Sequence, residues 1–256
     1  MSQSKEAYTE STRRIIESLD CPYQVFTSDQ TANEVEEGYK LAAIRGKKEG
    51  FTPLLVVSSD ILADILESLK KDPSARDTII QQPEKNAEEM LKEWYEEFIE
   101  EYQEMDEEEM REAWYSQTGE ELDEELGETI SEFTSFCISS DNEIEETILL
   151  EIPVKNPWEV IAWVPMGGWN ECPAADDMME VCRYWYKKYG AVPALVSTDT
   201  LEFVLEQPVS KEESMQAAKE HYAFCTDRVD QGTETGTLAE LASCISKSNY
   251  WFFWWD

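Results

Sequence analysis

Two segments in the C-terminal part of the chain contain the residue types that could carry out chemistry. The first is the loop sequence GlyGlyTrpAsnGluCysPro at 167–173, which offers an aromatic ring, an amide and a thiol. The second is the segment 221–232. Together they hold the candidate ligand-binding residues Trp169, Asn170, Cys172, His221, Cys225, Asp227, Asp230 and Gln231. A thiol beside an imidazole is a minimal nucleophile and base, and carboxylates with an amide can hold a cation or a polar ligand.

Each of these segments also has a structural interpretation, which we favour. The glycines of the 167–173 loop permit a tight turn with positive φ between a strand and a helix, and Asn170 can bond to the backbone there. Asp227 and Asp230 lie where a helix is predicted to end, so they oppose the helix dipole. A buried network of ion pairs with Arg228 accounts for them better than a metal, and we expect no metal site.

The chain lacks the common catalytic signatures. His221 is its only histidine, which excludes zinc sites that need two imidazoles. Phosphate-binding GxxxxGK[ST], dinucleotide-binding GxGxxG and nucleophile-elbow GxSxG patterns are absent as well. The sequence therefore predicts no cofactor, assigns no catalytic residue and favours a role that is not enzymatic.

The charge of the chain is strongly negative. Its 21 basic and 56 acidic residues give a net charge of −35 at pH 7. This charge excludes a basic surface for direct nucleic-acid binding and disfavours binding to anionic membranes. Residues 88–133 hold 20 of the acidic residues against Lys92 and Arg111. An apolar stripe at helical spacing runs through the start of this segment, formed by Leu91, Trp94, Tyr95, Phe98, Tyr102 and Met105. We expect an amphipathic acidic helix here, a second over 107–115 and a third after Gly119.

This acidic segment has three alternative roles. It can be a solvated face, a surface that meets a basic protein, or an imitation of a nucleic-acid backbone. The candidate partner-binding residues are Glu96, Glu97, Glu100, Glu101, Glu104, Glu107 and Glu108. Like charges on adjacent helical turns destabilise the helix, and a cationic partner would relieve that cost.

Compartment follows from what the sequence lacks. The first residues have no apolar signal-peptide core, and no apolar run approaches a membrane span. Six widely spaced cysteines without a CxxC pair predict reduced thiols. We expect a cytoplasmic protein, not bound to membranes, whose oligomeric state the sequence leaves open.

The predicted fold is α/β, with α+β as the alternative. Residues 49–67 and 189–206 are similar, and in both a glycine ends a predicted helix and a proline begins a predicted strand, Gly50 and Pro53 in one, Gly190 and Pro193 in the other. Segments 22–25 and 157–160 supply matching earlier strands. Asp60 and Asp199 are then N-caps of matching helices.

This similarity predicts two related strand–helix–strand–helix halves, which share a mixed sheet or form two adjoining lobes. Convergence of short turns is the alternative explanation. The predicted regions are 1–87, an acidic helical insertion at 88–145, and 146–256. Residues 250–255 show no polar alternation, which predicts a central or doubly packed strand.

Motifs of the C-terminal part resemble a known family. They are TrpValProMetGlyGlyTrpAsnGluCysPro at 163–173, TyrGlyAlaValPro at 189–193, AspThrLeuGlu at 199–202, the segment HisTyrAlaPheCysThrAspArgValAspGlnGly at 221–232, and TrpPhePheTrpTrpAsp at 251–256. Their order resembles the bacterial domain of unknown function 4253, over about residues 158–256. The resemblance implies a cytosolic bacterial protein and assigns no activity.

The hypothesis that follows is a cytosolic protein-binding factor, immunity-like or adaptor-like, that engages a basic partner. Immunity is suggested only by analogy with other small acidic bacterial domains. A small-ligand-binding domain or enzyme, with its site around 167–173 and 221–232, is one alternative. A nucleic-acid mimic is the other.

Overall fold

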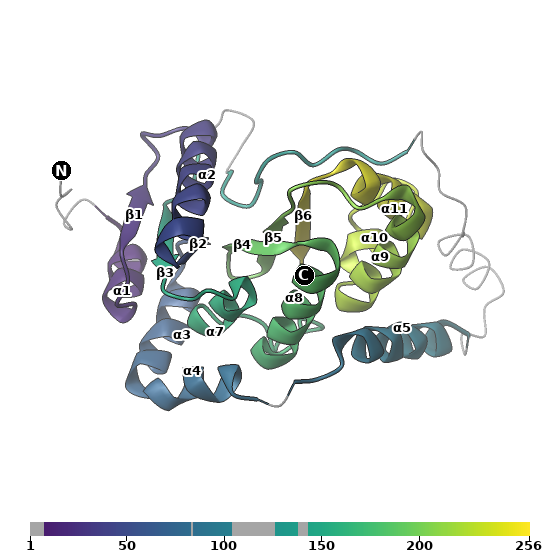
Figure 1. The fold of residues 1–256 in the computed structure, drawn as a ribbon, viewed down its shortest axis with the longest axis horizontal. Helices are drawn as coiled ribbons and strands as arrows, with labels where there is room; N and C mark the ends of the chain where they lie inside the picture. The colour runs from purple at the N-terminus through teal and green to yellow at the C-terminus, as the bar shows by residue number, and fades with distance from the viewer. Residues whose placement is uncertain (1–7, 83, 104–125, 138–142) are drawn as a thin grey trace.

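The protein forms a mixed α/β structure around one six-stranded sheet (Figure 1). It is described here from a computed structural model that places residues 8–82, 84–103, 126–137 and 143–256. The strands follow the order β1 (Tyr23–Phe26), β3 (Thr147–Ile152), β2 (Thr52–Val57), β4 (Val192–Val196), β5 (Thr200–Val204) and β6 (Tyr250–Trp254). The neighbours β2 and β4 are parallel and the other neighbouring pairs are antiparallel. The expected α/β class with a mixed sheet is confirmed.

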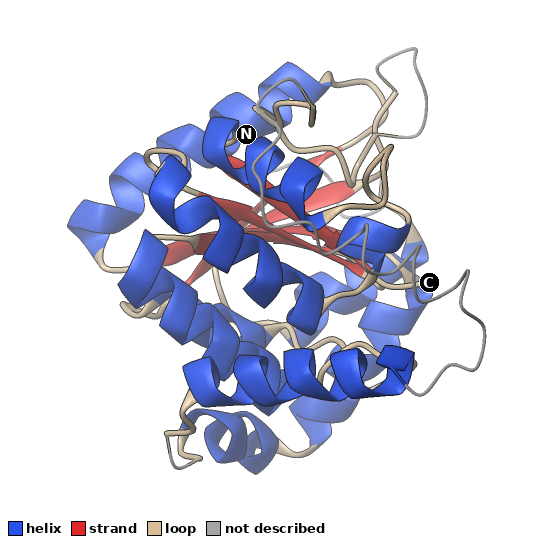
Figure 2. Ribbon diagram, turned by 90° about the vertical axis from the view of Figure 1, so that its right-hand side faces the viewer, coloured by secondary structure: helices blue, strands red, loops and turns tan. Residues whose placement is uncertain are grey.

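Helices lie on both sides of the strands (Figure 2). The described helices are α1 (Glu10–Ser18), α2 (Ala32–Glu49), α3 (Asp60–Lys71), α4 (Pro73–Ile80), α5 (Ala87–Gln103), α7 (Val160–Trp163), α8 (Ala175–Tyr189), α9 (Lys211–Phe224), α10 (Asp227–Asp230) and α11 (Leu238–Lys247), with a 3₁₀ turn at Pro157–Glu159. Alternate residues of β2 enter different cores. Leu54 and Val56 join the core that includes α1, α3 and α8, while Leu55 and Val57 join the core under α2. Burial on both faces explains why this strand is continuously apolar.

Two helix–glycine–strand units lie at the centre of the sheet. Gly50 ends α2 and Gly190 ends α8, both in the left-handed conformation, with φ of 85° and 73°. The strands that follow are the parallel neighbours, and their register pairs Leu55 with Leu195. This pairing joins the residues that the sequence similarity aligns. A common origin of the two halves stays a prediction, as do the boundaries of the three predicted regions.

Beyond these strands, the predicted matching of the two halves is wrong. Residues 200–204 form β5 rather than a helix, because Ser197 closes a tight turn, its backbone N–H donating to Thr200 O at 2.9 Å. Asp199 lies in that turn and caps no helix. In the first half α3 does form, but Ser59 is its N-cap and Asp60 its first residue.

The first strand of the second half also lies outside the residues predicted for it. Residues 157–160 form the 3₁₀ turn and the start of α7. The strand that precedes them is β3, and it pairs with both β1 and β2. The second part of the chain therefore inserts a strand between two strands of the first part, so the halves share one sheet and are not separate lobes.

The aromatic C-terminal strand packs on both faces, as predicted, but it lies at the sheet edge and not at its centre. Tyr250 contacts the ring of Phe133 on one side at 5.0 Å between centroids. Trp251 and Phe253 contact Trp185 on the other, at 5.5 and 5.3 Å. Helices and the 130–136 segment thus cover most of this edge strand, while Phe252 and Trp254 stay partly exposed.

The first acidic helix forms as predicted and is α5. Leu91 is buried, Trp94 and Tyr95 pack against the core, and the ring of Phe98 lies 6.2 Å from that of Tyr222 on α9. The helix lies along α8 and α9, visible below them in Figure 1. The helices predicted over 107–115 and after Gly119 fall outside the described residues. In the part of the chain that is described, no helix has the length and apolar character of a membrane span.

Candidate functional site

The two segments singled out for chemistry meet at the C-terminal end of β6. Asn170 Nδ2 donates to Asp256 O at 2.7 Å, and Thr226 Oγ1 donates to Glu171 Oε2 at 3.1 Å. Asp227 accepts from the backbone N–H of Asp256 at 3.3 Å. The tertiary structure therefore brings the 167–173 loop, the 225–231 segment and the chain end together.

The 167–173 loop is closed by its own hydrogen bonds. Gly168 N–H lies 3.0 Å from Cys172 O and 3.1 Å from Pro173 O. Gly167 has φ of 84°, and a Cβ there would lie 2.1 Å from Pro173 O, so this position requires glycine. The loop follows α7 and not the predicted strand, and Trp169 is partly buried against the core.

The thiols and the histidine of the candidate set are buried. Burial raises the pKa of both Cys172 and Cys225 to about 12, and Cys225 Sγ lies 3.0 Å from Trp254 O. His221 is enclosed by aromatic rings, the nearest being Trp251 at 4.4 Å, and burial lowers its pKa well below the usual value. Among the described residues no hydrogen bond joins the imidazole to either thiol. These features favour packing over nucleophilic catalysis.

The carboxylates of the second segment lie on a short helix that was not predicted from the sequence. α9 ends at Phe224, and Asp227 begins the one-turn α10, so Asp227 complements a helix start instead of opposing a helix end. Gln231 Nε2 donates to Asp227 Oδ1 at 2.7 Å. Burial, followed by the charge of Asp227, raises the pKa of Asp230 to about 6.

Arg228 does not form the predicted network. Its guanidinium is buried over the ring of Phe253 at 5.7 Å, and no ion pair to Asp227 or Asp230 is found in the described ranges. Within the same residues no group of three or more histidine, cysteine or acidic side chains is arranged to hold a metal.

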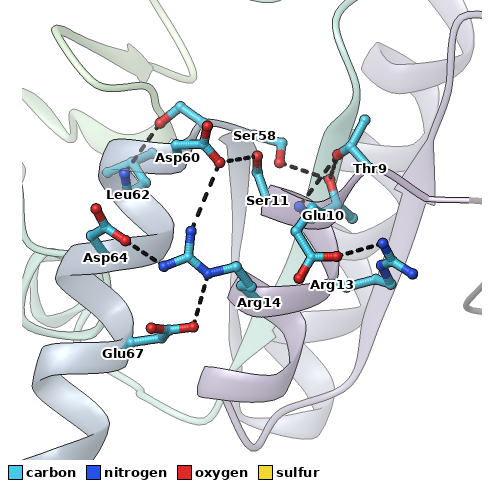
Figure 3. Close-up of polar contacts among 12 residues, drawn as sticks. Thr9, Glu10, Ser11, Arg13, Arg14, Ser58, Asp60, Leu62, Asp64 and Glu67 are labelled. Atoms are coloured by element: carbon cyan, nitrogen blue, oxygen red, sulfur yellow. Dashed lines mark hydrogen bonds and ion pairs between the residues drawn. The ribbon is translucent and has the colours of Figure 1, made fainter.

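The C-terminal ends of β2 and β4 carry hydroxyl groups, and Figure 3 shows Ser58, which follows β2. Thr12 Oγ1 donates to Ser58 Oγ at 2.7 Å, and Thr9 Oγ1 donates to Thr12 Oγ1 at 3.1 Å. Thr198 Oγ1 donates to Ser59 Oγ at 2.9 Å and so links the two strand ends. The polar groups at this end satisfy one another.

A cluster of ion pairs lies beside these hydroxyls and joins α1 to α3. Arg14 contacts Asp60, Asp64 and Glu67, and Figure 3 shows its side chain pointing from α1 toward α3. The two carboxylates in hydrogen bonds, Asp64 and Glu67, raise the pKa of the guanidinium. This cluster joins two helices at the surface, and the guanidinium of Arg14 is already bound to carboxylates.

A cleft of about 1440 Å³ opens at the opposite, N-terminal ends of β2 and β4. This cleft was not predicted from the sequence. Six lysines line it, namely Lys40, Lys47, Lys48, Lys155, Lys187 and Lys188. Its acidic lining residues are Glu49, Glu206 and Glu213. A positively charged concavity of this kind is unexpected on a chain with a net charge of −35.

A sequence signal for this cleft exists. LysLysGluGly at 47–50 and LysLysTyrGly at 187–190 end the two helices that precede the parallel strands. Because β2 and β4 are neighbours in the register Leu55 with Leu195, the two lysine pairs come to the same end of the sheet. The glycines indicate matching caps, whereas lysines in the last turn of a helix are common and indicate no site by themselves.

Half of these lysines have carboxylate partners. Lys47 contacts Glu206 at 2.7 Å, Lys40 contacts Glu36 on the same helix at 3.0 Å, and Lys188 contacts Glu220 at 2.7 Å. Lys48, Lys155 and Lys187 form no ion pair within the described residues, and all three are exposed. The nitrogen of Lys187 lies 6.0 Å from the centre of the Trp158 ring.

The predicted partner-binding residues are placed in part. Glu96, Glu97 and Glu100 are exposed on α5. The backbone of Glu101 belongs to the same helix, and its side chain is not described. Glu104, Glu107 and Glu108 lie outside the described residues.

Comparison with known proteins bears on the C-terminal part alone. The family described as Domain of unknown function (DUF4253) matches residues 148–256, which confirms the resemblance inferred from the motifs. Neither a curated protein nor a solved structure matches the chain. The family description assigns no activity.

Proposed function

We propose that this protein, whose C-terminal part carries the DUF4253 domain, is a non-enzymatic binding factor of the immunity or adaptor kind that engages a basic protein partner. The observation that carries the proposal is α5, whose apolar face is fixed to the core while its outer face presents carboxylates. The cytoplasm is the compartment proposed for this role.

The anchoring of α5 supports the proposal. Leu91 is only 1% exposed, and the ring of Tyr95 lies 6.4 Å from Tyr222 in an edge-to-face contact. A helix held by such contacts is already ordered before a partner arrives. Binding then costs less conformational entropy than it would for a free acidic segment.

The charge on the outer face is the second support. Six exposed carboxylates occupy the described part of the helix, on Glu88, Glu89, Glu93, Glu96, Glu97 and Glu100. Lys92 is the basic residue among them and lies 3.5 Å from Glu96. Like-charged pairs three and four residues apart, such as Glu93 with Glu97, each cost a few tenths of a kcal/mol. A basic partner would remove that repulsion.

The buried thiols and histidine argue against the enzymatic alternative. A nucleophilic cysteine needs a lowered pKa and access to substrate. Cys172 and Cys225 have neither property, since both are buried and their pKa values are raised.

The test compares two variants with equal changes in charge. The first replaces Glu93, Glu96, Glu97 and Glu100 with glutamine, and the control makes the same change at four exposed positions outside α5, namely Glu37, Glu128, Glu212 and Glu234. Both are used with the full chain in affinity capture from a lysate of the source cells at low salt. The proposal expects a basic protein that binds the wild type and the control, and is lost from the α5 variant and at high salt.

Equal capture by both variants would show that the α5 face is not the binding surface. Absence of any basic partner at low ionic strength would refute the proposal as a whole. Where a partner is found, competition with duplex DNA distinguishes the alternatives. Displacement of the protein by DNA would identify the acidic face as a nucleic-acid mimic.

A further inference from the structure

We infer that the lysine-lined cleft at the N-terminal ends of β2 and β4 is a second binding site, and that it takes a small molecule carrying two or more phosphate groups. The inference concerns a different surface from α5 and does not depend on the proposed function. It rests on where the lysines converge, on how they are paired and on the size and lining of the cleft.

The convergence of the lysines comes from the topology. Lys47 and Lys48 end α2, Lys187 and Lys188 end α8, and both helices lead directly into the parallel neighbours β2 and β4. Lys155, just after β3, reaches the same end, its Cε lying 3.9 Å from the position of a Cβ on Gly50. Three elements from distant parts of the chain thus supply ammonium groups to one cleft.

A structural explanation of these lysines accounts for only part of them. A helix C-terminus carries about half a negative charge, so two such ends offset about one positive charge. Of the acidic lining residues, Glu206 is paired with Lys47 and Glu49 with Arg45, at 4.0 Å, and Glu213 offsets one more positive charge. Within the described part of the chain, Lys48, Lys155 and Lys187 are the three lining ammonium groups without carboxylate partners, and about one positive charge therefore remains. On a chain with a net charge of −35 this surplus is a local exception.

The dimensions of the cleft indicate a molecule and not a single ion. Its volume of about 1440 Å³ exceeds the roughly 300–1,000 Å³ of ordinary small-ligand sites. Tyr186 presents 38% of its surface and packs on Trp158 at 5.4 Å between ring centroids. The lining therefore combines cations with an exposed aromatic ring.

Phosphate groups match this lining better than carboxylates do. Each phosphate monoester carries up to about two negative charges and three acceptor oxygens. A di- or triphosphate consequently delivers, within a few ångströms, the charge that an acidic peptide spreads over several residues. Lysine ammonium groups bind such oxygens as point charges.

Isothermal titration of the full chain tests the site, with tripolyphosphate and ADP as probes at low salt and without divalent cations. Orthophosphate, adenosine and hexaglutamate are the comparison ligands. We expect saturable binding of tripolyphosphate and ADP, binding of orthophosphate that is at least tenfold weaker, and none of adenosine. The variant Lys48→Gln/Lys187→Gln should lower the affinity for tripolyphosphate at least tenfold.

The matched control is Lys71→Gln/Lys92→Gln, which removes two positive charges outside the cleft and should bind as the wild type does. All four side chains are exposed, so we expect each variant to fold as the wild type does. Thermal unfolding of each variant verifies this. No saturable binding of either probe would overturn the inference. So would equal binding by the cleft variant, or tighter binding of hexaglutamate than of tripolyphosphate, which would identify an acidic-peptide site.

Discussion

The two ends of the central sheet differ in chemistry, although the same strands form both. At the C-terminal ends of β2 and β4, hydroxyl groups such as those of Thr12 and Ser58 bond to one another. At their N-terminal ends, lysines such as Lys48 and Lys155 line an open cleft. Ligands of open α/β sheets usually collect at the C-terminal ends of the strands. This protein closes that end and leaves the other open.

The connections of the strands explain the difference. A usual C-terminal-edge site uses the free N–H groups of helices that follow parallel strands. Here β4 turns directly into β5, so it supplies no helix, and α3 after β2 is capped by Ser59, which accepts from Leu62 N–H at 3.2 Å. At the opposite end α2 and α8, which lie on different faces of the sheet, both finish, and their last turns favour lysine. The position of a binding site therefore follows from local connections and not from the fold class.

Substitution of a glycine in the closed 167–173 loop should have the largest effect. Gly167→Ala forces a Cβ to within 2.1 Å of Pro173 O at a positive φ, so we expect a loss of about 3 kcal/mol or more in the free energy of unfolding. Gly168→Ala has the same backbone strain but meets no atom within 4 Å, and it should cost about 1–2 kcal/mol. Urea unfolding measures both. Equal losses would mean that the loop is not closed as described.

The pH dependence of stability should show a second large effect, away from both ends. Glu202 on β5 is buried and accepts from Ser135 N–H at 2.8 Å, and burial raises its pKa to about 7. A carboxylic acid whose pKa is raised in the folded state stabilises the folded protein at pH values below the pKa of the unfolded state, which is about 4.5. That contribution is lost as the pH rises from about 4.5 to about 7, and amounts to about 3 kcal/mol.

Glu202→Gln should therefore flatten the fall in unfolding free energy between pH 4.5 and 7. Chemical unfolding across this range measures the slope, and the surface substitution Glu212→Gln should leave it unchanged. Asp230, whose pKa is raised in the same direction, should retain a smaller share of the slope. An unchanged slope in Glu202→Gln would show that this carboxyl does not titrate in the folded state as inferred.

The smallest effects compare the two ends directly. Thr12 is fully buried, and Thr12→Val removes its hydrogen bond to Ser58, which should cost about 1 kcal/mol. Lys48→Gln in the open cleft should change stability by less than about 0.5 kcal/mol, since the side chain is exposed and unpaired among the described residues. A larger loss from Lys48→Gln than from Thr12→Val, measured by thermal unfolding, would contradict the assignment of closed and open ends.

Local features of the fold were predictable because they depend on nearby residues. The left-handed caps at Gly50 and Gly190, the buried strand β2 and the amphipathic helix α5 all follow from residue type and spacing. The helix predicted after Asp199 was not found, because ThrLeuGluPheVal suits a strand equally well once a neighbouring strand is present. Short apolar runs do not distinguish the two structures.

The candidate site was predictable to a similar extent. The 167–173 loop and the 225–231 segment were selected by residue type, and they do meet, as the bond from Asn170 to Asp256 shows. Their burial could not be inferred from sequence, since a cysteine or histidine in a motif can be exposed or enclosed. The cleft was not predicted because lysines are common residues, and only the pairing of β2 with β4 brings these to one end of the sheet.

The sequence by itself determined the charge of −35, the concentration of carboxylates on one amphipathic helix and the two helix–glycine–strand units. Only the tertiary structure decided that β3 inserts between β1 and β2, that β5 is a strand, and that the paired lysines before Gly50 and Gly190 face one cleft. The reason is physical. Caps and amphipathic faces arise within a few residues, whereas the pairing of strands far apart in the chain is selected by the packing of the whole sheet.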